Sequence, residues 1–438
     1  MMHSKEDKLD ISTLQAGIRA ALDEMRWVDH HDHVGGQFRD PPATEIDLPY
    51  FLTHTYLGGD LVSAGLPEES FAAEERWAYL QEGGDETQAC WEALRPYLSH
   101  VRSTIYYRYL LIGLCDLYGW EGEEVDEGDW RALSDRLREE SRKGPEWALS
   151  VVNRMGVKKI LLDVGWWSLD PIPALHGDPR FAQIVRMDPF ITGEMEFVEK
   201  LSGSRIHSFT HYMQALDGAF ERAVREGAVG IKSGLAYERS LYYERVPLSE
   251  AERIWTKGLA NVSAEERKAF QDAMMHAVCE RCARYHLPFQ IHSGIQAGNL
   301  NTLANANPLH LTNLFQTYPD VRFDLFHGGY PFTSEAGLMA KYFPNVYVDG
   351  CWLAHISPAA YKRALDEWIE IVPANKIFAW GGDHGIIDHS YASLLLAKDL
   401  IAEVLAHKVA DSYFSEKVAL HLAQRIVGQN AWEVYGFE

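Results

Sequence analysis

The chain has 438 residues, of which 47% are hydrophobic, and a formal net charge of −22 at neutral pH. This charge disfavours nucleic acid as a partner, because the phosphates would be repelled. The apolar runs are too short for a transmembrane helix, and the polar residues 1–7 lack the apolar region of a secretion signal. We therefore expect a cytoplasmic protein with no nucleic-acid or membrane partner, while the net charge carries no information about a small-molecule substrate.

The cysteines indicate the redox compartment. Five lie at irregular spacing, which does not suit a disulfide framework and favours a reducing compartment. Cys279 and Cys282 form a CxxC pair, a spacing found in zinc and redox sites. The pair falls in a helix predicted over 265–285, and no second CxxC accompanies it. We therefore interpret these two residues as buried thiols.

The first predicted strand, 27–33, carries the stretch Asp-His-His-Asp-His at its end. Side chains two residues apart on a strand point to the same side, so His31 and His33 are expected to face the same way. Two imidazoles on one side of a strand can bind one divalent metal ion.

Seven further β-rich apolar runs follow, and longer amphipathic segments separate most of them. The predicted strands are 159–164, 184–188, 228–232, 288–292, 321–327, 346–349 and 377–380. The predicted helices between them are 194–201, 212–226, 265–285, 309–318, 334–343 and 359–371. Strands that alternate with helices indicate parallel strands, and eight such units predict a closed (β/α)8 TIM barrel. The first strand is not followed by a GxGxxG turn, which disfavours an open dinucleotide-binding sheet.

A long segment separates the first two predicted strands. Residues 41–145 form a mostly helical insertion in this interpretation, with helices over 68–82, 86–107 and 130–142. At this point of a barrel the insertion would lie over the C-terminal mouth, where barrel active sites are found. Residues 1–40 would hold an N-terminal helix and the first strand, and residues 146–438 the rest of the barrel and the C-terminal helices. The aromatic-rich insertion would also suit the interface of a homo-oligomer.

Metal-binding residue types recur at the ends of the predicted strands. Lys232 ends the fourth strand, His292 the fifth and His327 the sixth, and Asp383 follows the eighth. Because these ends converge on one mouth of a barrel, we expect the four side chains to meet the two histidines of the first strand. A buried lysine or aspartate is costly unless it is paired, which favours a functional cluster over packing. The set predicts a metal site.

This pattern resembles that of the amidohydrolase superfamily, which uses HxH on strand one, Lys or Glu on strand four, His on strands five and six, and Asp on strand eight. Residues 232–239, 292–311 and 327–336 are similar, more narrowly, to the amidohydrolase domain sometimes fused ahead of glutamine-synthetase-like domains. We expect a stand-alone form of that domain. The strand-eight motif differs from the usual one, because it reads Gly382-Asp383-His384 with no hydroxyl residue before the aspartate.

The resemblance implies a divalent ion, expected to be Zn2+, held by His31, His33 and Asp383, with His292 as a further ligand. The ion would lower the pKa of a bound water, and the metal-bound hydroxide would attack a carbonyl carbon. Asp383 would take the proton of the water and pass it to the leaving group. His327 would either ligate a second ion or polarise the substrate carbonyl.

Lys232 decides how many ions the site holds. As a carbamate, it would be a bridging carboxylate that holds two ions. As a plain ammonium, it would repel a second cation and bind a carboxylate of the substrate instead. The resemblance favours a site that can hold two ions.

Substrate contacts are predicted beside these residues. Arg186 ends the third predicted strand, and Tyr237 and Arg239 follow the fourth. An arginine offers a bidentate fork to a carboxylate, although an ion pair at the surface or an interface would also explain either arginine. Trp166 follows the second strand and is expected to wall the pocket.

Three functions stay open at this stage. The first is a metal-dependent hydrolase that cuts an amide, an ester or a related C–N or C–O bond of a small, carboxylate-bearing substrate. The second is a non-hydrolytic relative, either a decarboxylase or a uronate-type isomerase, on the same barrel. The third is a scaffold without catalysis, which an intact ligand set disfavours because buried ligands without a metal would be destabilising.

Overall fold

The computed structural model describes residues 10–42, 45–67, 86–163 and 172–437. A sheet of eight parallel strands forms its centre, and each strand pairs with the next along the chain. The strands are β1 Val28–Asp32, β2 Lys159–Asp163, β3 Phe181–Arg186, β4 Ala228–Ser233, β5 Phe289–Ile291, β6 Phe323–Leu325, β7 Val346–Asp349 and β8 Ile377–Phe378. Two backbone hydrogen bonds join the segment after β8 to the end of β1. Asp383 N donates to the His31 carbonyl (2.8 Å), and His33 N donates to the His384 carbonyl (2.9 Å). The predicted (β/α)8 barrel is confirmed.

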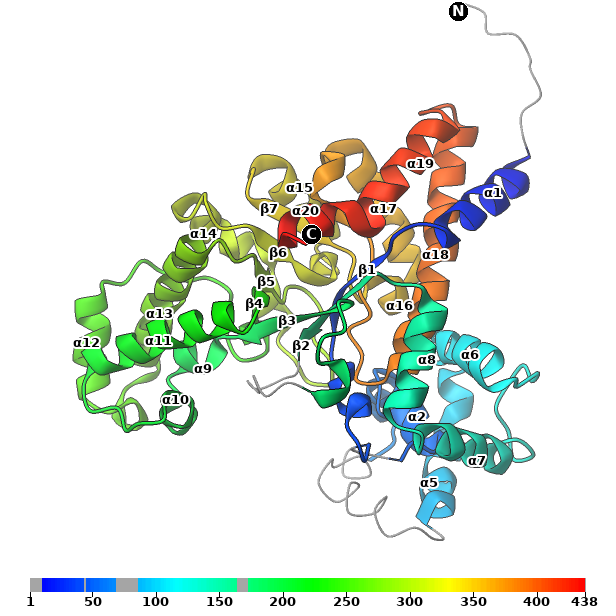
Figure 1. Ribbon diagram of the computed structural model, residues 1–438, viewed down its shortest axis with the longest axis horizontal. Helices are drawn as coiled ribbons and strands as arrows, with labels where there is room; N and C mark the ends of the chain where they lie inside the picture. Colours follow the sequence, from blue (N-terminus) through cyan, green and yellow to red (C-terminus); the bar gives the residue numbers. More distant parts are fainter. Residues whose placement is uncertain (1–9, 43–44, 68–85, 164–171, 438) are drawn as a thin grey trace, which may run out of the picture.

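Helices surround the strands (Figure 1). Those outside the insertion are α1 Ile11–Asp23, α8 Pro145–Met155, α9 Asp188–Thr192, α10 Met195–Ser202, α11 Phe209–Arg225, α12 Leu248–Thr256, α13 Ala264–Tyr285, α14 Thr312–Thr317, α15 Thr333–Tyr342, α16 Leu353–Ile356, α17 Pro358–Ile371, α18 Ile387–Ala410, α19 Glu416–Gln424 and α20 Asn430–Tyr435. All five residues of β1 are buried, as expected for a parallel strand that is covered on both faces. The third strand begins earlier than predicted and ends at Arg186, because Asp188-Pro189 opens α9 with proline in its first turn.

The insertion between β1 and β2 is helical, as predicted. It contains α2 Leu48–Thr53, α3 Leu57–Ser63, α5 Glu86–Val101, α6 Ile105–Tyr118 and α7 Trp130–Ser141, most of which gather on one side of the barrel in Figure 1. The single helix predicted over 86–107 is wrong, because the chain leaves α5 after Val101 and an extended Thr104 starts α6. The helix predicted over 68–82 lies outside the described residues.

Two tyrosines of the insertion reach the end of the barrel where β8 stops. The Tyr56 hydroxyl donates a hydrogen bond to the Asp383 carbonyl. The Tyr109 hydroxyl, on α6, lies 2.8 Å from Nε2 of His384. The insertion therefore contacts the backbone that presents Asp383.

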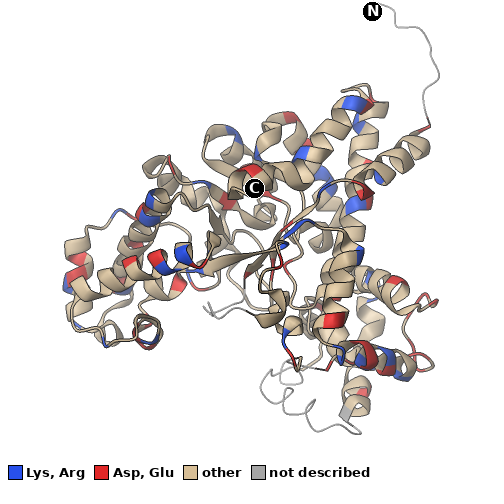
Figure 2. Ribbon diagram, viewed as in Figure 1, with Lys and Arg blue, Asp and Glu red and all other residues tan. Residues whose placement is uncertain are grey.

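The outer helices carry the charges. Basic and acidic residues alternate along these helices in Figure 2. Of the helices in the described part of the chain, none combines the length and the apolar composition needed to cross a bilayer.

The CxxC pair lies on the inner face of α13. Cys279 and Cys282 are both buried and free, and burial raises the pKa of each thiol. A buried protonated thiol is a poor nucleophile, so the interpretation of the pair as packing residues agrees with the structure.

The C-terminal segment covers the opposite end of the barrel. The Ile426 carbonyl accepts a hydrogen bond from Ala379 N (2.9 Å), and the Asn430 side-chain amide donates to the Ile377 carbonyl (2.8 Å). Gly428 lies against the chain just before β1, where an added Cβ would sit 1.9 Å from the Arg26 carbonyl oxygen. Any side chain at this position would displace backbone, so the contact requires glycine.

Replacing Gly428 tests the close contact between this glycine and the Arg26 carbonyl. We expect Gly428→Ala to lower the free energy of unfolding by about 1–3 kcal/mol, because the methyl group must push the β1 approach aside. The matched control is Gly17→Ala on the exposed side of α1, where nothing lies within 4 Å of an added Cβ. That change should stabilise the chain by about 0.5–1 kcal/mol through helix propensity. Thermal unfolding of both variants gives the comparison, and equal melting temperatures would contradict the close approach.

Candidate metal centre

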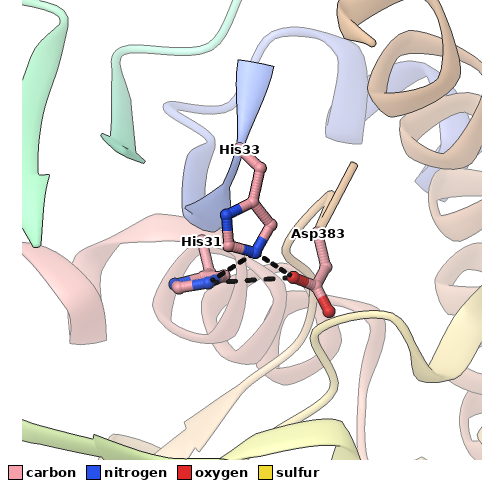
Figure 3. Close-up of side chains that lie close together, drawn as sticks. All are labelled: His31, His33 and Asp383. Carbon is pink, nitrogen blue, oxygen red and sulfur yellow. Dashed lines mark hydrogen bonds and ion pairs between the residues drawn. The ribbon is translucent and has the colours of Figure 1, made fainter. Parts of the chain in front are cut away.

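β1 delivers two histidines to the mouth. The Nε2 atoms of His31 and His33 lie 3.3 Å apart, so the two rings face one another as the HxH spacing predicts (Figure 3). Ligand atoms on one tetrahedral zinc ion, each about 2.0–2.1 Å from it, are also separated by about 3.3 Å. His31 is fully buried, whereas His33 has 30% of its side chain exposed.

Asp383 faces both histidines from the segment after β8. Its Oδ1 lies 3.2 Å from Nε2 of His33 and 3.7 Å from Nε2 of His31 (Figure 3). Its Oδ2 lies 3.7 Å from Nε2 of His327, so the carboxylate spans two groups of imidazoles. The residue has φ +58°, a conformation that costs free energy for a non-glycine residue and that is common at functional sites. Gly382 allows this turn, since a Cβ there would lie 2.8 Å from Oδ2 of Asp32.

His292 and His327 form a second imidazole pair. Nδ1 of His292 lies 3.1 Å from Nε2 of His327. The other nitrogen of each ring donates to a carbonyl, from His292 Nε2 to Ile295 (2.8 Å) and from His327 Nδ1 to Cys351 (3.1 Å). A carbonyl oxygen only accepts, so in the neutral rings the two nitrogens that face each other are both unprotonated. Two lone pairs at this distance fit a cation placed between them.

The far nitrogens of the first pair are held in the same way. Nδ1 of His33 donates to the Asp163 carbonyl (2.9 Å), and Nδ1 of His31 donates to Oε1 of Gln290 (3.0 Å). The amide nitrogen of Gln290 in turn donates to the His30 carbonyl (3.0 Å), which fixes the orientation of the amide. Such contacts set the tautomer of a metal-binding histidine and aim its Nε2.

Burial sets the charge of the cluster. It lowers the pKa of His327 to about 4, and burial together with neighbouring positive groups lowers the pKa values of His31 and His292 well below the usual range. Burial opposes ionisation of Asp383, but the hydrogen bond from His33 and the nearby imidazoles hold its pKa well below the ordinary value. For His33, burial lowers the pKa, but the hydrogen bond to Asp383 and the charges of Asp163 and Asp383 together outweigh burial and raise it. Imidazoles with a low pKa, such as those of His31, His292 and His327, beside an ionised carboxylate are the donor set that binds zinc and similar ions.

Lys232 and Arg186 lie at the same mouth. Nζ of Lys232 is 3.4 Å from the centre of the Phe326 ring, and Phe326 packs edge-on against His31. Burial lowers the pKa of Lys232 to about 8, with Asp383 opposing this effect and Arg186 adding to it. Arg186 donates from Nε to Oδ2 of Asp163 at 2.7 Å. Among the described residues this is its one hydrogen bond, so the two terminal nitrogens of the guanidinium are left for a ligand.

Of the other predicted substrate residues, one lies near the imidazoles and one does not. Tyr237 lies at the rim, with its ring centre 4.7 Å from that of His292 and 41% of the residue exposed. Arg239 does not join the cluster, because its guanidinium is bound to Asp272, Gln271 and backbone carbonyls that fix the loop after β4 to α13. An ion pair, the alternative to carboxylate binding considered for both arginines, therefore explains Arg239. Trp166 lies outside the described residues.

Some groups at the site were missed in the sequence. Gln290 and Asp163 hold the histidines, and each is a buried polar residue next to buried apolar residues of its strand, which is the signal that was available. Tyr56 lacked any such signal, because it comes from the insertion. It stacks on Trp352 with ring centres 4.0 Å apart, and Trp352 has φ +63°.

A sequence profile described as Amidohydrolase matches residues 207–437, more than half of the chain. The chain belongs to the amidohydrolase family. The recognition of the superfamily from the strand-end residues is thus confirmed. A curated relative, protein fluG of Emericella nidulans, is 28% identical over 221 residues, which are 47% of this chain and 25% of that protein. The chain therefore spans about a quarter of the length of this relative.

Solved structures share the whole fold. Glucuronate isomerase from Caulobacter crescentus matches with a TM-score of 0.79 at 15% identity, over 100% of this chain and 97% of that one. Uronate isomerase from Thermotoga maritima matches with a TM-score of 0.75 at 14% identity, over 99% and 100%. A chain from Lactobacillus casei described as a metal-dependent hydrolase matches with a TM-score of 0.67 at 18% identity, over 96% and 97%. At these identities the likeness establishes the fold alone.

Removing the hydrogen bond between Gln290 and His31 tests whether His31 is a metal ligand. We expect Gln290→Leu to weaken Zn2+ binding by about 10–100-fold, because the imidazole loses the acceptor that fixes its tautomer. Tyr435→Phe is the matched control, since the Tyr435 hydroxyl accepts from the same amide (2.8 Å) but does not touch His31. Competition with a chromophoric chelator measures both affinities. Equal affinity of Gln290→Leu and the unaltered chain would contradict the role of His31 as a ligand.

Proposed function

We propose that this chain is a metal-dependent hydrolase that cleaves a C–N or C–O bond beside a carbonyl in a small, carboxylate-bearing substrate. One observation carries the proposal: four imidazoles and the Asp383 carboxylate converge at the barrel mouth, where the ring nitrogens that face inward have no carbonyl partner. A cationic clamp, Arg186, lies at the same mouth.

The first-strand histidines and Asp383 would hold the principal ion, and Zn2+ suits their nitrogen and oxygen donors. Such an ion, when bound, supplies Lewis acidity and lowers the pKa of water toward neutrality. The burial of His31 keeps bulk water from one side of the site, while the 30% exposure of the His33 side chain leaves an approach from the other. The metal identity and the ligand roles are part of the proposal.

Asp383 is the proposed proton carrier. Its low pKa makes it an ionised base at neutral pH, and its position between two imidazole pairs would bring its oxygens close to a water bound there. It would accept the proton of the attacking water and deliver it to the leaving nitrogen or oxygen.

For His327, the hydrogen bonds favour the ligand role over polarisation of the substrate carbonyl. Its Nδ1 proton is used by the Cys351 carbonyl, so the nitrogen that faces the site is a lone pair and cannot donate to a substrate. His292 presents its Nδ1 lone pair to the same point. The pair is therefore proposed to bind a second ion.

Arg186 and Lys232 are proposed to recognise the substrate carboxylate. The terminal nitrogens of Arg186 offer the fork, and Asp163 holds the guanidinium in place. Lys232, packed over Phe326, adds positive charge without a hydrogen bond to any described residue. Tyr237 at the rim would contact the part of the substrate that lies outside the carboxylate.

An isomerase is the second candidate. The full-length match to two uronate isomerases favours it, because the fold likeness includes the insertion over the mouth. Uronates also carry a carboxylate, which the Arg186 clamp would accept. Decarboxylation on the same barrel is the related non-hydrolytic reaction.

A substrate screen separates these reactions. The zinc-loaded chain is incubated with N-acyl amino acids, carboxylate esters and hexuronates, and the products are followed by amine release, acid release, ketose formation and CO2 release. We expect a new amine or acid, with loss of the reaction on chelation and its return on adding Zn2+. Aldose–ketose conversion or CO2 release without hydrolysis would overturn the proposal in favour of a non-hydrolytic reaction.

The two arginines give a direct test of substrate recognition. We expect Arg186→Lys to lower kcat/KM by about 10–100-fold for a carboxylate substrate, because a lysine cannot form the bidentate contact. The loss should appear mainly in KM, and it should vanish for the same substrate with its carboxylate converted to an amide. Arg239→Lys is the control, with unchanged KM. An equal loss for both substrates would show that Arg186 acts on something other than the carboxylate.

A further inference from the structure

Cys351 lies against the second imidazole pair, although no feature of the sequence marked it. It follows β7 and is fully buried. Its Sγ, one ring nitrogen of His327 and one carboxylate oxygen of Asp383 all lie within 4.8 Å of one another. These are three atoms of metal-ligand type from three different strand ends.

The backbone aims this thiol. The Cys351 N–H donates to Oδ1 of Asp349 (2.7 Å), and the Cys351 carbonyl accepts from Nδ1 of His327 (3.1 Å). Hydrogen bonds thereby hold both the N–H and the carbonyl group of Cys351. On the outer side, Gly381 leaves room for the sulfur, because a Cβ there would lie 2.8 Å from Sγ. A larger residue at either position would close this space.

The shared carboxylate divides the cluster into two ligand sets. Oδ1 of Asp383 faces the first pair, at 3.2 Å from Nε2 of His33, and Oδ2 faces the second, at 3.7 Å from Nε2 of His327. The nitrogens that face each other in the second pair both lack a proton, as their carbonyl partners require. A cation at this second position would have the His327 nitrogen, one Asp383 oxygen and the Cys351 sulfur as its near donors, with the His292 nitrogen 3.1 Å from that of His327.

We propose that Cys351 is the sulfur donor of this position, so that a second, soft-metal position is built around His327, Asp383 and the Cys351 thiolate, with His292 beside His327. The inference rests on the proposed metal-dependent function. Binding forms an Sγ–metal bond and breaks the S–H bond, and the thiol proton leaves to solvent, so loading of this position releases a proton. Sulfur favours Zn2+ over Mg2+ or Mn2+. The thiolate would supply the negative charge that a Lys232 carbamate would otherwise provide, and this charge would offset the repulsion from a Lys232 ammonium, so that two ions bind without bicarbonate.

X-ray absorption at the zinc edge tests this ligand directly. The full chain is loaded with Zn2+ in bicarbonate-free buffer, and the metal is counted by mass spectrometry. We expect two zinc ions per chain and a sulfur shell at about 2.3 Å in the zinc spectrum. Cys351→Ser should lose the sulfur shell and one of the two ions. Cys282→Ser, which removes a buried thiol of α13 away from the mouth, should keep both.

The outcomes separate this inference from the proposed function. Zinc bound with only nitrogen and oxygen neighbours in the unaltered chain overturns the role of Cys351, and the hydrolase proposal stands if activity still depends on the metal. A second ion that binds only after bicarbonate is added overturns it in favour of a Lys232 carbamate. A chain that binds no zinc overturns both proposals. The spectrum of the unaltered chain decides the matter even if Cys351→Ser fails to fold.

Discussion

The site depends on unprotonated nitrogens that face one another in a buried place. Nε2 of His292 and Nδ1 of His327 each donate a hydrogen bond to a backbone carbonyl. Neither neutral ring therefore has a proton left to donate between Nδ1 of His292 and Nε2 of His327, which lie 3.1 Å apart. An unpaired polar group in the interior costs roughly 1–3 kcal/mol. In the first pair a proton on His33 that points to Asp383 can relieve the same conflict, and the raised pKa of His33 agrees with this. A divalent cation bound at each pair would satisfy these nitrogens, which would explain why the chain keeps these residues inside.

The barrel supplies the geometry. Parallel strands end at one rim, so residues from β1, β5 and β6 and from the turn after β8 meet although hundreds of positions separate them. The rim is also where the backbone is strained, with positive φ at His327, Trp352 and Asp383. Tertiary packing must hold such conformations, and they are concentrated at functional sites. The insertion contributes by holding the Asp383 carbonyl through Tyr56.

Much of the fold was predictable because amphipathic segments separate most of the eight β-rich runs, a pattern that favours a closed barrel. The residues that point inward were predictable for the same reason, since His292, His327 and Asp383 stand at strand ends. Their partners were not. Gln290 and Asp163 look like ordinary polar residues until the strands are paired, and Cys351 looks like a packing thiol until its distance to Asp383 is known. Arg186 and Arg239 were indistinguishable in the sequence, because only the fold shows that Asp272 and Gln271 occupy the second guanidinium.

The fold likeness and the site chemistry bear on different questions. Full-length similarity to chains described as uronate isomerases and as a metal-dependent hydrolase establishes the fold, and one fold can serve more than one reaction. In this chain the proposed substrate-binding residue Arg186 is held by Asp163, which also supplies its backbone carbonyl to His33. Asp163 would therefore couple the position of the substrate to that of the metal.

Anomalous diffraction from crystals of the zinc-loaded chain, recorded on both sides of the zinc absorption edge, tests the central claim most directly. The account predicts a strong anomalous peak within coordination distance of Nε2 of His31, Nε2 of His33 and Oδ1 of Asp383. Zinc bound at another place, with these three side chains turned away from one another, would contradict it.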